Sequence, residues 1–236
     1  MITTAILARN EVGNDLREVL TDAQRYSDEI LLLDDGSTDG TPGLARQLGC
    51  QVKTRKSPKG MWGNETPARK ELWDWGSKVA KDGWLLIQDA DMLLVGDPRP
   101  LTRSTVCNAW AWVLYDCWSS TTYREDGYWQ GHRVPRPWMV CPSRVPEGWM
   151  PQWPDKGIHC GHIPPNFPML ACAVEPNVLS WKHLAYSTDE RRVAKWRQYL
   201  AKADQLTPFE RQHAESILPP DHPARGEASR SAVAPE

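Results

Sequence analysis

Features that mark several other classes of protein are missing from this chain of 236 residues. No stretch approaches the roughly 20 consecutive apolar residues of a membrane-spanning helix, so no membrane contact is expected. Residues 1–10 lack the basic start and cleavable apolar stretch of a secretory signal, and we therefore expect a cytoplasmic protein. The 30 Asp plus Glu nearly balance 28 Lys plus Arg, which excludes a uniformly basic nucleic-acid binder.

Cysteine pairs and phenylalanine are also scarce. The six cysteines form no CxxC pair and no dense framework, so we expect reduced core thiols rather than disulfides. Two Phe stand against thirteen Trp. A large ring with one N–H donor suits a groove that holds a sugar or a base, although packing in the core is the commonest role of tryptophan.

The first hundred residues alternate between short apolar runs and amphipathic segments, which predicts an α/β fold with a mostly parallel, Rossmann-type sheet flanked by helices. Strands are expected at residues 2–8, 29–34 and 84–88. One helix is expected at 14–25, with Leu16, Val19, Leu20 and Ala23 on its apolar face. Two more helices begin at Thr41-Pro42 and Thr66-Pro67, where we expect threonine as the N-cap.

Beyond residue 100 the pattern changes. One more strand is expected at 108–115, but residues 133–176 hold ten of the twenty prolines, so regular structure there must be short. A capping box at residues 187–190 predicts a basic helix to residue 202, and a short helix follows Thr207. We expect one domain with an α/β half (1–100), an irregular Pro- and Trp-rich half ending in helices (101–218) and a disordered tail (219–236).

Two acidic turns carry the strongest functional signal. Residues 33–41, LDDGSTDGT, follow one buried strand, and Asp89-Ala90-Asp91 follows another. Because ligands bind at the carboxyl ends of strands in open α/β sheets, we expect both turns at one cleft. Two carboxylates aimed at one small volume suit a divalent cation such as Mn²⁺ or Mg²⁺. Taken alone, the first turn is equally well interpreted as a solvated turn rich in helix-capping residues.

Together these motifs resemble the inverting, nucleotide-sugar-dependent glycosyltransferases of family 2, whose fold is called GT-A. The resemblance covers residues 1–95 and rests on residues 6–11, 33–41, 68–70 and 86–91. It implies transfer of a sugar from a nucleoside diphosphate, with UDP the first choice, to a hydroxyl acceptor, with Mn²⁺ or Mg²⁺ as cofactor. Residues 1–100 would then bind the nucleotide sugar, and residues 101–218 the acceptor.

The resemblance also implies roles for individual residues. Donor binding falls to Ala8, Arg9, Glu11, Asp35, Arg69 and Asp89, with Asp35 reading the base. The metal ligands are Asp91, the last residue of the DxD motif, and a late histidine, His183. The general base must have a pKa near the working pH and lie opposite the leaving group. For this role we expect Asp155 first and then His159, while Glu147 and His162 lie in the same irregular region.

The acceptor is left open by the sequence. The basic helix at 191–202 places Trp196 among cations, which is how single-stranded bases are held, although such a run is usually a solvated face. Some viral glycosyltransferases modify hydroxymethylated DNA, so a resemblance to that type makes such DNA one candidate acceptor.

Other interpretations also remain open. A nucleotidyltransferase uses an α/β sheet, paired carboxylates and Mg²⁺, but normally has a glycine-rich loop with a basic residue after its first strand, which residues 9–13 match poorly. A non-catalytic carbohydrate or nucleic-acid binding module built from the Trp-rich half would need neither Asp91 nor a cation. A zinc site at residues 159–162, HCGH, fits no common ligand spacing, and acceptor binding or packing suits these residues better.

Overall fold

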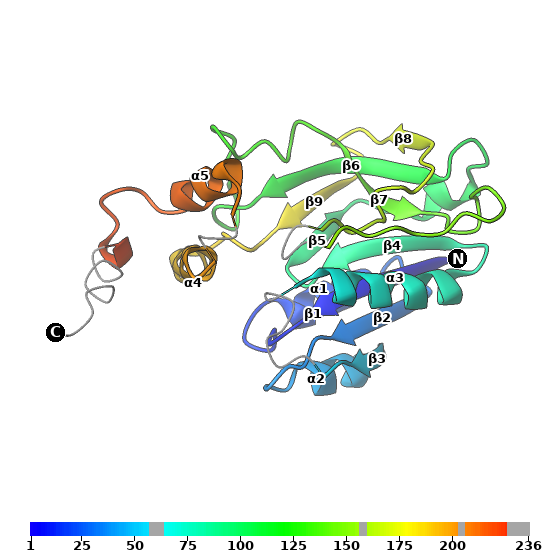
Figure 1. Ribbon diagram of the computed structural model, residues 1–236, viewed down its shortest axis with the longest axis horizontal. Coiled ribbons are helices and arrows are strands. Elements are labelled where there is room, and N and C mark those ends of the chain that lie inside the picture. Colours follow the sequence, from blue (N-terminus) through cyan, green and yellow to red (C-terminus); the bar gives the residue numbers. More distant parts are fainter. Residues whose placement is uncertain (57–63, 156–159, 203–205, 226–236) are drawn as a thin grey trace. The chain divides into compact units, whose positions relative to one another are not determined.

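The computed structural model describes residues 1–56, 64–155, 160–202 and 206–225 (Figure 1). It divides into two compact units. The first comprises Met1–Leu114 and Arg133–Lys182, and the second comprises Tyr115–His132 and the chain from His183 onward. Across the described ranges, every helix is too short or too polar to cross a bilayer.

The order of elements confirms the alternation predicted for the first hundred residues. The strands are β1 (Ile2–Ala8), β2 (Glu29–Asp34), β3 (Gln51–Thr54), β4 (Trp84–Asp89), β5 (Met92–Val95), β6 (Ala109–Asp116), β7 (Arg136–Val140), β8 (Ala171–Ala173) and β9 (Ser180–His183). The helices are α1 (Leu16–Ala23), α2 (Thr41–Gln47), α3 (Thr66–Ala80), a short 3₁₀ helix η1 (Arg99–Arg103), α4 (Asp189–Leu200) and α5 (Pro208–Ser216).

The sheet changes direction halfway across. Its order is β3-β2-β1-β4-β7-β6-β9-β5, with β8 paired to β6. β1, β2, β3 and β4 run parallel, whereas β7 is antiparallel to both β4 and β6. The predicted parallel, Rossmann-type arrangement therefore describes the N-terminal strands, and the later strands make the sheet mixed.

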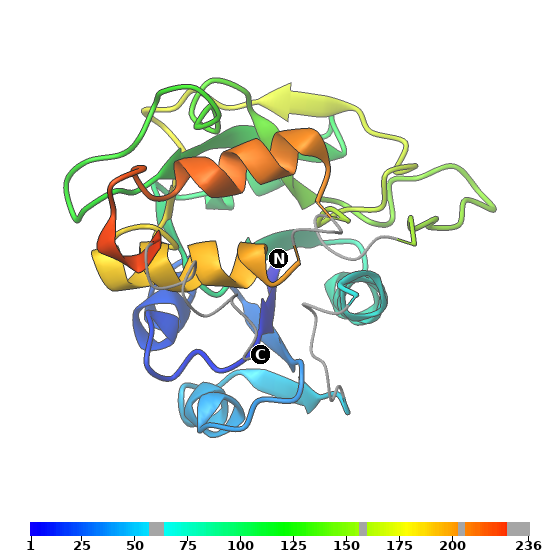
Figure 2. The ribbon, with the colours of Figure 1, turned by 60° about the vertical axis from the view of Figure 1, so that its left-hand side comes forward.

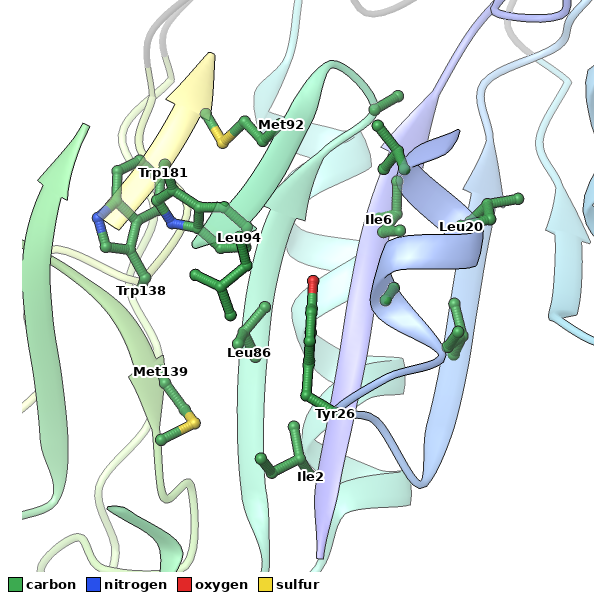
Figure 3. Close-up of a cluster of buried hydrophobic side chains, with 14 of the residues drawn as sticks. Ile2, Ile6, Leu20, Tyr26, Leu86, Met92, Leu94, Trp138, Met139 and Trp181 are labelled. Atoms are coloured by element: carbon green, nitrogen blue, oxygen red, sulfur yellow. The ribbon is translucent and has the colours of Figure 1, made fainter. Parts of the chain in front are cut away.

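Two hydrophobic clusters cover the two faces of the parallel strands. Helices α1 and α2 pack on one face and α3 on the other (Figure 2). The apolar face predicted for the first helix is confirmed, because its four predicted residues are all buried. The cluster under α1 also contains Tyr26, whose hydroxyl donates to Gln88 at 2.9 Å, and the neighbouring rings of Trp138 and Trp181 (Figure 3). All six cysteines are free, and five of them are buried.

The threonine N-caps predicted for α2 and α3 are wrong. Thr41 and Thr66 are the first helical residues, after Gly40 and Glu65 respectively. Each hydroxyl has a partner from a distant segment: Thr41 Oγ1 accepts from the Glu11 backbone N–H at 2.7 Å, and Thr66 Oγ1 donates to a carbonyl of the irregular region at 2.7 Å. A tertiary partner therefore replaces the local cap.

The second unit also corrects details of the prediction. The N-cap of α4 is Thr188, which accepts from the Arg191 backbone N–H, so the box predicted from residue 187 is shifted by one position. Trp196 is buried and lies 5.7 Å from the Arg225 guanidinium, which leaves its ring no open face of the kind that holds a base. The tail predicted from residue 219 is hydrogen-bonded as far as Arg225, which donates to the Leu218 carbonyl at 2.7 Å.

Candidate active site

The carboxyl ends of β1, β2 and β4 meet at one edge of the sheet. In the pairing register, Ala8 lies beside Asp34, and Leu7 lies beside Asp89. The Asp35 backbone N–H continues the ladder and donates to the Ala8 carbonyl at 2.9 Å. Neighbouring strands are about 4.8 Å apart, so the ends of β2 and β4 are separated by roughly 10 Å. The two acidic turns therefore share one edge of the sheet.

Hydrogen bonds hold the segment after β1 against the turn after β2. Asn10, with a left-handed φ of 57°, donates through its backbone to Ser37 Oγ at 2.9 Å and accepts from the Thr38 backbone at 2.8 Å. The Glu11 backbone is tied to Thr41 in the same way. Gly36 has a φ of 76°, which a glycine adopts without steric cost. The backbone at residues 9–11, predicted to line the donor pocket, is thus fixed beside Asp35.

Asp35 is fully buried, and charged groups surround it. Arg9 Nη1 donates to its backbone carbonyl at 2.5 Å, and Arg55 Nη1 donates to its carboxylate Oδ1 at 2.5 Å. The other carboxylate oxygen, Oδ2, is buried and has no hydrogen-bond partner among the residues that the structure describes. Buried polar atoms are rarely left unpaired, so this oxygen is a candidate acceptor for a ligand N–H.

A chain of ion pairs links α3, β4 and the irregular region. Glu65 accepts from Arg69 Nε at 2.6 Å, Arg69 Nη2 donates to Asp89 Oδ1 at 2.8 Å, and Asp89 Oδ2 lies 2.9 Å from His162 Nε2. Burial opposes ionisation of Asp89, but His162 and Arg69 outweigh it and hold the pKa of Asp89 well below its ordinary value. Burial likewise opposes the charge on Arg69, but Asp89 and Glu65 raise its pKa. Asp89 is therefore a fixed, ionised acceptor.

The two predicted metal ligands lie in different units. Asp91 lies in the turn between β4 and β5 of the first unit and is partly buried. His183 ends β9 in the second unit, where its Nδ1 lies 2.7 Å from Asp116 Oδ1. A carboxylate that holds one ring nitrogen in this way is the usual support of a metal-binding histidine. Among the described side chains, no three His, Cys, Asp or Glu form a metal-binding group.

Of the two predicted general bases, only Asp155 lies within the described residues. Asp155 is exposed and accepts from Asn64 Nδ2 at 3.1 Å, close to the start of α3. His159 lies outside the described residues. Cys160, of the same HCGH segment, is buried, and burial raises the pKa of its thiol. His162 contacts Asp89 instead of a metal cluster.

Sequence reasoning missed Arg55, which pairs with Asp35, and Glu65, which pairs with Arg69. Arg55 follows β3, and its role is visible only once β3 is known to lie beside β2 with Thr54 paired to Asp34. Glu65 precedes α3 by one residue and pairs with Arg69 across one helical turn. The spacing of Glu65 and Arg69, four residues apart, is a local signal that could have revealed this pair.

Residues 3–97, less than half of the chain, match the model for glycosyl transferase family 2. This segment is therefore similar to glycosyl transferase family 2. The match confirms the predicted resemblance and, with the sheet topology, the predicted GT-A-like α/β fold. The family segment contains both acidic turns and Arg69, and it ends directly after β5.

Solved structures give a more distant likeness. One is glucosyl-3-phosphoglycerate synthase from Mycobacterium tuberculosis with Mn²⁺ and UDP-glucose, at 22% identity and a TM-score of 0.36, covering 48% of this chain and 43% of that chain. The same enzyme with Mg²⁺ and UDP gives 19% identity, a TM-score of 0.35 and coverage of 48% and 43%. The match thus spans less than half the length of those enzymes. No curated protein sequence matches the chain.

Proposed function

We propose that this protein is a metal-dependent glycosyltransferase that moves a sugar from a nucleoside-diphosphate sugar, a UDP-sugar first, to a hydroxyl acceptor with inversion. One observation carries the proposal. The strands that end in Asp34, next to Asp35, and in Asp89 flank β1 at a single edge of the sheet, in the segment that matches the glycosyltransferase family model. That edge is where open α/β sheets bind nucleotides.

The donor would be held by the groups already fixed at this edge. The unpaired Oδ2 of Asp35 accepts an N–H of the base, and the backbone at residues 9–11 closes one side of the same pocket. Asp89, held by Arg69 and His162, is an acceptor for a hydroxyl of the sugar or ribose. Arg69 has one buried guanidinium nitrogen, Nη1, without a hydrogen-bond partner among the described residues, which provides a donor for the ligand.

The residues present fit a hard divalent cation. Mg²⁺ and Mn²⁺ bind through one or two carboxylates together with substrate phosphates, so Asp91 and a diphosphate suffice as the core of such a site. His183, which Asp116 contacts in the second unit, stays a predicted second ligand. When bound, the cation stabilises the negative charge that develops on the departing diphosphate.

The acceptor hydroxyl needs a base on the face of the sugar opposite the diphosphate. Asp155 remains the first candidate, because its carboxylate is exposed and its segment is tied to the start of α3 by Asn64 and Thr66. His159 is the second. Either group would take the hydroxyl proton as the acceptor oxygen bonds to the anomeric carbon and the bond from that carbon to the diphosphate breaks. Attack from the face opposite the diphosphate inverts the anomeric carbon.

Replacement of Asp91 tests the proposal. Asp91→Ala should abolish sugar transfer and donor hydrolysis at saturating Mn²⁺ while leaving the circular dichroism spectrum unchanged. The matched control is Asp97→Ala, which removes an exposed carboxylate of the same unit that pairs with Arg99 on the surface. Unchanged turnover in the Asp91 variant would contradict the assignment. Release of pyrophosphate from a nucleoside triphosphate and a sugar phosphate would instead identify a nucleotidyltransferase.

A further inference from the structure

Arg55 is a charged residue of the site that the proposed function leaves without a role. It directly follows the edge strand β3, and its backbone N–H donates to the Asp34 carbonyl at 2.8 Å, which continues the β2–β3 ladder. Its guanidinium joins two carboxylates: Nη1 donates to Asp35 Oδ1 at 2.5 Å, and Nε donates to Glu71 Oε2 at 2.9 Å. The pairing therefore connects three elements, β2, β3 and α3.

The burial of these groups shows which contact matters. The Asp35 side chain is 0% exposed, the Arg55 side chain 18% and the Glu71 side chain 46%. A pair with an exposed carboxylate contributes little to stability, whereas a buried carboxylate without a counter-ion is strongly destabilising. The main role of Arg55 is therefore to be the counter-ion of the buried Asp35 carboxylate, and its pair with Glu71 matters less.

The geometry of the pair also restricts what Asp35 can bind. An ionised carboxylate only accepts hydrogen bonds, and Arg55 occupies Oδ1. Oδ2 is then the acceptor left for a ligand. Since both guanidinium contacts are anchored, one to β2 and one to α3, the plane of the Asp35 carboxylate is fixed before any ligand arrives.

We propose that Arg55 is a positioning residue for base recognition: it orients the Asp35 carboxylate so that Oδ2 meets an N–H of the donor's nucleobase. This inference rests on the proposed function. Arg55 acts through Asp35 and does not contact the sugar or the acceptor. Its loss should weaken nucleotide binding and leave the rate of transfer at saturating donor almost unchanged.

A double-mutant cycle on UDP binding tests this role. Calorimetric titration with UDP and Mn²⁺ would compare wild type, Arg55→Gln, Asp35→Asn and the double variant. We expect Arg55→Gln to raise the Kd for UDP by about 10- to 100-fold, the range of a lost hydrogen bond to a charged group. The double variant should bind no more weakly than Asp35→Asn alone, because Arg55 works only through that carboxylate. The control Arg17→Gln removes an exposed arginine of α1 and should bind as wild type does.

Several outcomes separate this inference from the proposed function. Wild-type affinity in Arg55→Gln, or losses that simply add in the double variant, would overturn the positioning role while the glycosyltransferase assignment stands. If the wild-type protein binds none of the nucleoside diphosphates UDP, GDP, dTDP and CDP, both the positioning role of Arg55 and the proposed function are refuted. If Arg55→Gln does not fold, Arg55→Lys provides the test, because lysine keeps the charge but lacks the planar guanidinium. A UDP affinity between those of wild type and Asp35→Asn would support the positioning role. Wild-type affinity would refute it.

Discussion

Arg69 lies between two carboxylates, Glu65 and Asp89, and its charge favours the ionised form of both. Burial raises the cost of ionising Glu65, yet the neighbouring guanidinium outweighs this and lowers the pKa of Glu65 below its ordinary value of 4.5. A carboxyl group whose pKa is depressed in the folded state stabilises that state above its unfolded pKa. The contribution is lost as the pH falls through the folded value.

Glu65→Gln should therefore lower the free energy of unfolding at pH 7 by about 1 to 3 kcal/mol, because the buried guanidinium loses a charged partner. The difference from wild type should shrink below about pH 4.5 and vanish at lower pH, where the wild-type carboxyl is also protonated. Urea unfolding at pH 7, 5, 4 and 3 measures this. Glu18→Gln, on an exposed position of α1, is the control. A gap that stays constant down to pH 3 would argue against the charge pair.

His162 gives a second residue-scale prediction. Its ring is 2.9 Å from Asp89 Oδ2, so His162→Ala removes this contact and leaves the carboxylate held less firmly, through the Arg69 bond to Oδ1. We expect about tenfold weaker donor binding with the fold retained, and partial recovery in His162→Asn, which can still donate. His222→Ala removes a histidine–aspartate contact of the second unit and serves as control. Equal donor affinity in His162→Ala and wild type would show that Asp89 needs no second partner.

At the scale of elements, local sequence was a good guide to where strands and helices begin and end. The predicted strands at 2–8 and 29–34 match β1 and β2 in full, because a run of apolar residues buried on both faces leaves little ambiguity. The helix caps were predicted less well. Thr41 is bonded by a backbone group 30 residues away, and no local pattern contains that partner.

The connection after β5 gives a prediction at this scale. Gly96 has a φ of 95°, and a Cβ placed on it would lie 2.0 Å from the Val178 carbonyl oxygen. Gly49 also has a positive φ, of 79°, but meets nothing within 4 Å. In both alanine variants the free energy of unfolding should fall by about 1 to 2 kcal/mol, because alanine is strained at a positive φ. For Gly96→Ala the clash should lower the free energy of unfolding by about 1 to 3 kcal/mol more, and urea unfolding measures the difference. Equal losses would mean that the backbone at residue 178 moves freely.

At the scale of the whole molecule, ligand binding should raise the stability of the folded protein. A ligand that binds only the folded state raises its stability by mass action, by about 2.7 kcal/mol at a concentration of 100 times Kd. We expect one nucleoside-diphosphate sugar, with UDP-sugars first, to raise the melting temperature, and more so with Mn²⁺. Thermal melts with UDP-, GDP-, dTDP- and CMP-sugars, with and without the metal, measure this. A panel in which no sugar nucleotide raises the melting temperature would favour a binding module of another kind.

The sequence by itself determined the parallel half of the sheet and the two acidic turns at its edge, since strand periodicity and turn chemistry are local properties. Only the tertiary structure decided how those carboxylates are held. Asp35 pairs with Arg55 across 20 residues, and Asp89 contacts His162 across 73. Such pairs depend on which strands lie side by side and on where an irregular, proline-rich segment packs. That information arises from burial of the whole core rather than from any short stretch of chain.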